Sequence, residues 1–192
     1  MRLFSNLYDR VTRWVQHPHA QRYLAALSFA ESSFFPIPPD VMLAPMSLFQ
    51  PQRAWRFAGL TTLASVAGGV LGYLIGMLAF EAIDPWLHQL GYWDAYLQAR
   101  DWFERWGFLA IFVAGFSPIP YKVFTITAGV VGMALLPFIA ASAVGRGARF
   151  FLVSALMVWG GERMERALRR YIDYVGWLVV LLAVVGYYLL RH

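Results

Sequence analysis

The sequence predicts an all-α integral membrane protein, an inverted repeat in which each copy is a re-entrant helical hairpin plus a transmembrane helix. Three observations predict it: an apolar composition, two proline-broken apolar stretches that resemble each other, and a one-sided distribution of arginines. Of the 192 residues, 59% are hydrophobic and 14% are charged, against about 25% charged residues in a soluble domain. So few charges cannot coat a soluble core, so lipid is expected to cover much of this single domain.

The same composition excludes several classes of function. The chain has no cysteine, so disulfides and thiolate chemistry are excluded. No metal-ligand spacing, nucleophile elbow or phosphate loop occurs, so we expect no cofactor, no metal and no enzymatic activity. The net charge is +5, but the basic residues flank apolar spans and do not form one polar patch. This arrangement favours contact with anionic lipid over nucleic acid.

Residues 1–23 precede the first apolar stretch and combine near-helical apolar spacing with interspersed charges. They lack the continuous apolar region and cleavage site of a signal peptide. We interpret them as an amphipathic helix in the membrane interface. An ordinary amphipathic helix packed on the domain is the alternative.

Uninterrupted apolar stretches predict the transmembrane helices. Residues 57–80 contain no charge and residues 132–159 contain two arginines, and both are long enough to cross a bilayer, whereas residues 175–190 are at the lower limit. Gly68, Gly72 and Gly76 repeat every fourth residue in the first of these, which favours close helix packing. Residues 84–105 are expected to form an outer loop or helix.

Two further apolar stretches, residues 24–49 and 107–131, are interrupted by FFPIPPD and FSPIPYK. Proline removes an amide donor and disfavours helix at the preceding residue. Each arm has about 11 residues, or roughly 17 Å of helix, about half of a ~30 Å hydrocarbon core. We therefore expect two re-entrant hairpins, with kinked spanning helices as the alternative. The predicted turns contain Pro36, Pro38, Pro39, Pro118 and Pro120.

The two hairpins are similar in sequence. Residues 34–41 and 116–123 share five of eight positions, and residues 64–68 and 141–145 match in the same order. With a cytoplasmic N-terminus, ten of the 16 basic residues lie inside and three outside, which follows the positive-inside rule. One crossing helix separates the copies, so they have opposite orientations, as in secondary transporters.

Five ionisable residues lie within the apolar segments: Glu31, Asp40, Lys122, Arg146 and Arg149. A charge at the bilayer centre costs about 2.5–3.5 kcal/mol even on insertion scales, unless it is paired or hydrated. Asp40 and Lys122 are equivalent in the repeat, so we expect them to face each other where the hairpin tips meet. One interpretation is a neutralising ion network that locks the hairpins. The other is a polar cavity where Lys122, Arg146 and Arg149 bind an anionic head group and Glu31 or Asp40 takes up a proton.

These motifs resemble those of a known family. FAESSFFPIPPDVML, residues 29–43, resembles the first signature of the DedA family (SNARE-associated or VTT domain), with Glu31 and Asp40 as its two acids. GFSPIPYKVFTITAG, residues 115–129, resembles the second signature, and the fit is closest to the YqaA-like branch. Many members have arginines on both sides of the second turn, where this chain has Ser117 and Lys122. Lys122 is the stand-in for those arginines, and Arg146 and Arg149 match a later basic position.

The resemblance covers about residues 24–158. It implies a multi-pass bacterial inner-membrane protein that flips undecaprenyl phosphate or phospholipid, sensitive to the proton motive force. The expected partners are therefore lipids with an anionic head group or lipid phosphate, and protons, while homo-oligomers are compatible with it. The alternatives are a proton-coupled small-solute or ion antiporter, and a membrane assembly or scaffold protein without transport.

Overall fold

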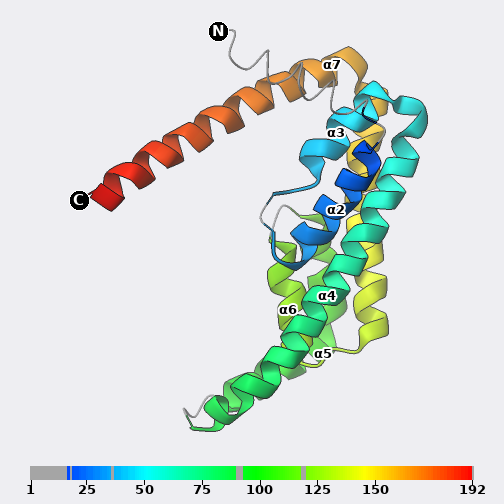
Figure 1. Cartoon of the computed structure of the whole chain (residues 1–192). Coiled ribbons are helices and arrows are strands. Elements are labelled where there is room, and N and C mark those ends of the chain that lie inside the picture. Colours follow the sequence, from blue (N-terminus) through cyan, green and yellow to red (C-terminus); the bar gives the residue numbers. More distant parts are fainter. Residues whose placement is uncertain (1–16, 18, 36, 90–92, 118–119, 192) are drawn as a thin grey trace.

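The described part of the chain is helical throughout. The computed structural model describes residues 17, 19–35, 37–89, 93–117 and 120–191, with only the backbone for 165–191 and a few other positions (Figure 1). Within these residues there is no strand, so the all-α prediction is confirmed. The elements are α2 (Ala20–Ser33), α3 (Asp40–Phe49), a short 3-10 helix η1 (Pro51–Arg53), α4 (Ala54–Gln89), α5 (Trp93–Phe116), α6 (Tyr121–Val130) and α7 (Leu135–Arg191).

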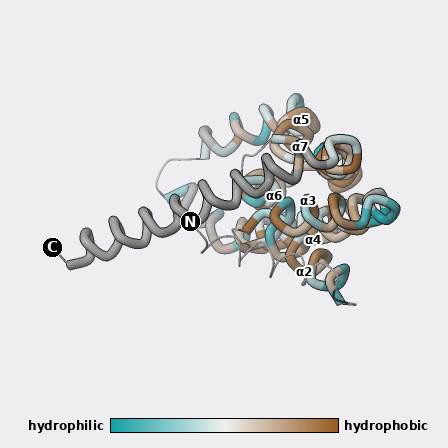
Figure 2. Tube along the Cα trace, turned by 90° about the horizontal axis from the view of Figure 1, so that it is seen from above, coloured by the Kyte–Doolittle hydropathy of each residue, from teal (hydrophilic) through white to brown (hydrophobic). Residues whose placement is uncertain are grey.

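Two helical segments are long and apolar enough to cross a membrane, Pro51–Ala82 and Leu135–Gly161. They contain the predicted spans 57–80 and 132–159, apart from three residues before Leu135. Large apolar side chains such as Leu63 and Leu136 are 73% and 80% exposed on them, and hydrophobic segments lie at the periphery of the bundle (Figure 2). Exposed apolar surface of this extent is typical of a face that meets lipid or another protein.

The long helix α7 contains one interruption, at Gly161. This residue has φ 47° and ψ −130°, outside the helical region, where glycine is the residue that pays no steric penalty. The predicted span 175–190 lies beyond it, where the backbone is helical and only the backbone is described. Most of the predicted interfacial helix 1–23 lies outside the described residues.

Both predicted proline turns are breaks between separate helices. The first break follows Ser33 and ends at Asp40, and the second follows Phe116 and ends at Tyr121. Pro39 and Pro120 stand immediately before α3 and α6, where the missing amide hydrogen costs no helical hydrogen bond. Pro38 lies in the first break, while Pro36 and Pro118 fall outside the described residues. The stretch 24–49 is therefore two helices, not one kinked helix, and the stretch 107–131 is likewise divided.

The four helices next to the breaks pack crosswise on the two long helices. Helices α2 and α6 pack on α4, while α3 and α5 pack on α7. In Figure 1, α2 and α3 lie beside one half of α4, and α5 and α6 beside the other half. Each broken pair is thus divided between the two long helices, and both breaks come to the middle of the molecule.

Small residues make this packing possible. A methyl group added at Gly68 would overlap the Phe29 carbonyl of α2, and one at Gly76 would overlap the Ile126 carbonyl of α6. At Gly72 the added methyl would overlap the Thr125 hydroxyl. The prediction that the four-residue glycine spacing serves close packing is therefore confirmed.

Candidate functional site

The two helix breaks meet around a buried guanidinium, that of Arg146 on α7. Its side chain is 3% exposed and forms an ion pair with Glu31 of α2. It also donates hydrogen bonds to Ser65 Oγ of α4, at 2.5 Å, and to Ser32 Oγ of α2, at 3.2 Å. Ser32 and Ser65 are themselves hydrogen bonded at 2.7 Å. We call Glu31, Ser32, Ser65 and Arg146 the Arg146 cluster, and it joins α2, α4 and α7.

Two aromatic rings enclose the same guanidinium. Its central carbon lies 4.8 Å from the ring centroid of Tyr121 on α6 and 4.7 Å from that of Phe150 on α7, within the range of cation–π attraction. The Tyr121 hydroxyl is hydrogen bonded to Ser142 Oγ at 2.5 Å, which fixes the ring. Arg146 is thus neutralised and enclosed by the protein itself, so a substrate cannot reach it without displacing these groups.

A second arginine, Arg149, joins the two breaks directly. It donates from one terminal nitrogen to Asp40 Oδ2 at 2.5 Å, and from the other to the Ser117 carbonyl at 2.6 Å. The side chains of Arg149 and Asp40 are 19% and 22% exposed, so this pair is more accessible than the Arg146 cluster. Asp40 Oδ1 is buried and accepts no hydrogen bond from a described residue. We call these contacts the Arg149 bridge.

Lys122, at the start of α6, corrects one prediction. Its ammonium donates to the Phe34 carbonyl at 3.5 Å, so the two breaks do meet, but among the described residues Asp40 pairs with Arg149 and not with Lys122. The reason is the crosswise packing: α3 carries Asp40 onto α7, whereas α6 carries Lys122 onto α4. The expectation that Asp40 and Lys122 face each other as partners is therefore wrong.

All five predicted residues therefore lie at or beside the junction of the breaks, but in separate environments. The acids Glu31 and Asp40 each form an ion pair with one arginine. Lys122 makes no ion pair with any described residue and is only partly buried. Of the three cations, Lys122 is therefore the one without an acidic partner among the residues that the structure describes.

Sequence reasoning missed the neutral partners Ser32, Ser65, Ser117, Tyr121 and Phe150. Serine and aromatic residues in apolar helices are ordinary packing residues, so their types alone give no signal. One signal was present: Ser65 and Ser142 are equivalent in the repeat, and each bonds a polar group at the junction.

Comparison with known proteins is consistent with the motifs. The family model of the VTT domain matches residues 35–159, which include most of the first break, the whole second break, and Arg146 and Arg149 of α7. An uncharacterized protein of Haemophilus influenzae is 49% identical over 192 residues, the full length of both chains. An uncharacterized protein of Histophilus somni is 47% identical over 191 residues, again over the full length of both. No solved structure gives a significant match. The chain belongs to the DedA family of VTT-domain proteins.

Proposed function

We propose that this protein is a lipid translocase that moves an anionic lipid, a phospholipid or undecaprenyl phosphate, across the bacterial inner membrane. The single observation that carries the proposal is the set of charges at the junction of two helix breaks, in a bundle whose outer surface is apolar. Irregular backbone and ionisable groups at membrane depth are tolerated only where protein or a wet cavity satisfies them. Such sites in membrane proteins are typically substrate or proton pathways.

In this proposal the chain is an inverted repeat with a cytoplasmic N-terminus, and each broken helix pair is a re-entrant hairpin. The crosswise packing supports this, because the two pairs make corresponding contacts with exchanged partners: α2 on α4 and α3 on α7, against α5 on α7 and α6 on α4. A pseudo-two-fold axis in the membrane plane relates the two pairs in this way, because it interchanges α4 and α7. The junction would then lie near the bilayer midplane.

The cations of the junction take different roles in the proposal. Lys122 contacts the lipid phosphate, because it is the cation without an acidic partner among the described residues. The Arg149 bridge is the gate, since it ties both breaks together and is partly accessible. Protonation of Asp40, whose Oδ1 lacks a hydrogen-bond donor among the described residues, would release Arg149 toward the phosphate. The Arg146 cluster holds the helices in place throughout.

The test is lipid translocation in proteoliposomes that carry a fluorescent phospholipid or labelled undecaprenyl phosphate. Lys122→Ala should lower the rate at least about tenfold, because a hydrogen bond to a charged group such as phosphate is worth about 1.5–3 kcal/mol. Arg100→Ala is the matched control, since Arg100 pairs with Glu104 on an exposed surface, and it should translocate as the wild type does. The two labelled lipids identify which is the substrate. Unchanged translocation by Lys122→Ala and Asp40→Asn together would overturn the assignment.

Proton-coupled ion antiport is a second candidate, favoured by Asp40 Oδ1, which accepts no hydrogen bond from any described residue. It predicts proton flux driven by an ion gradient in vesicles where no lipid moves, and loss of that flux in Asp40→Asn. Absence of both lipid movement and ion flux in the wild-type chain would leave the scaffold interpretation.

A further inference from the structure

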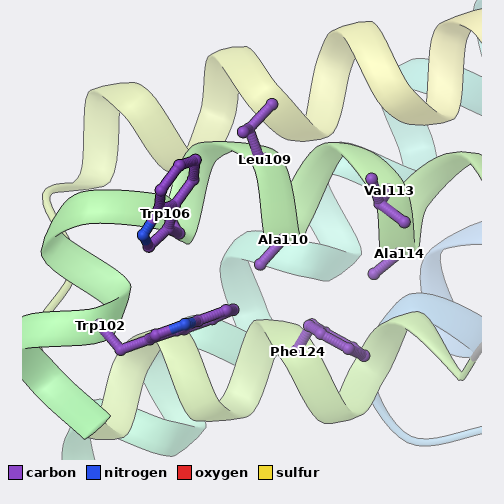
Figure 3. A pocket seen from close by; sticks show the side chains of 7 residues that line it. All are labelled: Trp102, Trp106, Leu109, Ala110, Val113, Ala114 and Phe124. Carbon is purple, nitrogen blue, oxygen red and sulfur yellow. The ribbon is translucent and has the colours of Figure 1, made fainter. Parts of the chain in front are cut away.

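An apolar groove between α5 and α6 has no part in the charged junction. Its volume is about 440 Å³, and its lining is almost entirely hydrocarbon and aromatic. This volume lies within the ~300–1,000 Å³ range of small-molecule sites. Figure 3 shows Trp102 and Trp106 at one end and Val113 and Phe124 at the other. Almost none of the surface that the described residues present to the groove is polar, so the chemistry of the groove selects for hydrocarbon.

The dimensions of the groove match one leaflet of a bilayer. Trp102, Trp106, Leu109 and Val113 lie on one face of α5, at helical spacings of four, three and four residues. From Trp102 to Val113 the helix rises by about 16 Å, close to half of a ~30 Å hydrocarbon core. Indole rings at the outer end fit the interface, where tryptophan is enriched. The groove therefore extends from the level of the head groups to the level of the helix breaks.

The inner end of the groove lies at the level of the charged junction. Ser117, whose carbonyl accepts from Arg149, comes directly after α5, and its amide donates to the Val113 carbonyl one turn earlier. Phe124, which lines the groove, lies two residues after Lys122 on α6. Residues two apart leave a helix on different faces, so the groove reaches the level of Lys122 but not its side chain. A hydrocarbon chain in the groove would thus end at the level of the cation that we assign to the lipid phosphate.

We propose that this groove binds one acyl chain of a lipid from the leaflet next to the N-terminus of α5, with the head group level with Trp102 and Trp106. The groove is a docking site for the lipid before its head group reaches Lys122. This inference rests on the proposed translocase function, but it concerns binding of the chain, which is measured without transport.

The absence of cysteine from the sequence makes a site-specific label straightforward. Ala110, which lines the groove, is changed to Ala110→Cys and labelled with bimane in the full-length protein. Ala67→Cys is the matched control, because Ala67 is an exposed alanine of α4 that does not line the groove. The probe is phosphatidylglycerol brominated at mid-chain, added in steps to the protein in detergent micelles. Bromine quenches bimane only at short range.

We expect that quenching at Ala110→Cys saturates at a low mole fraction of brominated lipid. At Ala67→Cys, quenching should increase in proportion to the lipid added and should not saturate. Unbrominated lysophosphatidylglycerol and phosphatidylcholine should both reverse the quenching, because the groove recognises the chain. Glycerol phosphate, a head group without a chain, should not. Identical concentration dependence at the two positions, or reversal by glycerol phosphate, overturns the proposal.

Filling the groove gives a second measurement. Val113→Trp, in the Ala110→Cys background, should raise the half-saturating lipid concentration roughly tenfold, since each excluded methylene costs several-fold in affinity. Val144→Trp is the control. The side chain of Val144, on α7, is 54% exposed, against 49% for Val113, and it lies outside the groove. A second copy of the chain covering the groove would overturn the proposal. It would be shown by quenching that disappears as the protein concentration rises, together with disulfide-linked dimers of unlabelled Ala110→Cys.

The two proposals fail separately. Saturable quenching in a chain that moves no lipid in proteoliposomes would retain the groove and reject the translocase. Translocation together with unsaturated quenching would retain the translocase and reject the groove.

Discussion

At the scale of single residues, the three cations of the junction differ in how completely the protein satisfies them. Arg146 has an acidic partner, two serine acceptors and two aromatic rings, and Arg149 has one acid and one carbonyl. Lys122 has a single carbonyl at 3.5 Å. Because guanidinium is planar and offers five donors, it can satisfy several fixed partners at once, whereas ammonium is a compact point charge. The residue types are therefore consistent with the roles proposed above, in which the two arginines are paired within the protein and Lys122 is assigned to the lipid phosphate.

The burial of the Glu31–Arg146 pair leads to a stability prediction. Arg146→Gln should lower the free energy of unfolding by about 3–5 kcal/mol, because it leaves the Glu31 carboxylate unpaired in a buried site. The measurement is unfolding by denaturing detergent in mixed micelles. Arg100→Gln, at an exposed ion pair, should change it by less than about 1 kcal/mol. The double variant Glu31→Gln with Arg146→Gln should recover part of the loss, and a double variant as unstable as the sum of both single changes would contradict this account.

At the scale of elements, prolines and glycines determine where helices break and how closely they pack. Prolines before α3 and α6 start new helices where the apolar pattern alone would continue one. Glycines of α4 bring its backbone against carbonyl groups of α2 and α6. The hydroxyls at these contacts donate across them, as Ser28 does to the Thr61 carbonyl and Ser33 to the Gly68 carbonyl, at 2.8 and 2.9 Å. Close approach and interhelical hydrogen bonds are the interactions that associate helices in lipid.

A comparison of two glycines on α4 tests this packing. Gly68→Ala should destabilise the protein by about 1–3 kcal/mol, because the added methyl overlaps the Phe29 backbone and overpacking has this cost. Gly59→Ala should be neutral or stabilise it by up to about 1 kcal/mol, since nothing lies within 4 Å of the added carbon and alanine is the better helix former. Unfolding in mixed micelles measures both. Equal effects of the two changes would show that α2 does not approach α4 as described.

At the scale of the whole molecule, the crosswise division of the two broken pairs over α4 and α7 is the main organising feature. It places both breaks in the middle of the bundle and both Arg146 and Arg149 of α7 against them. Neither pair could bury its breaks alone, because each needs the long helix of the other half. The charged junction therefore exists only in the assembled fold.

The proposed re-entrant topology makes a prediction about sidedness. Single cysteines at Arg22→Cys and Gln52→Cys, exposed at the two ends of the first broken pair, should react with an impermeant maleimide from the same side of the membrane. Gln98→Cys, exposed on α5, should react from the opposite side. The measurement is labelling of intact cells against inverted membrane vesicles. Labelling of Arg22→Cys and Gln52→Cys from opposite sides would mean that the first pair crosses the membrane, and the re-entrant proposal would be abandoned.

Much of the helix pattern could be predicted from the sequence because proline and apolar length act locally. The breaks after Ser33 and Phe116 follow from the chemistry of the imide bond, and the spans in α4 and α7 follow from uninterrupted apolar residues. The start of α5 at Trp93 was less evident, because its first turns contain Asp94, Arg100 and Asp101. Polar residues there indicated an outer loop or helix, and the helix continues without interruption into the apolar arm.

The sequence by itself determined that the chain is apolar, broken twice at prolines, and charged at five positions within its apolar segments. These are properties of composition and of neighbouring residues, which act before any packing. Only the tertiary structure decided which charges meet. Repeat equivalence suggested Asp40 with Lys122, but α3 lies on α7 and α6 on α4, so Asp40 reaches Arg149 and Lys122 remains without an acidic partner among the described residues. Pairing of charges depends on which helix faces cross, and helix crossing is decided by the packing of distant segments.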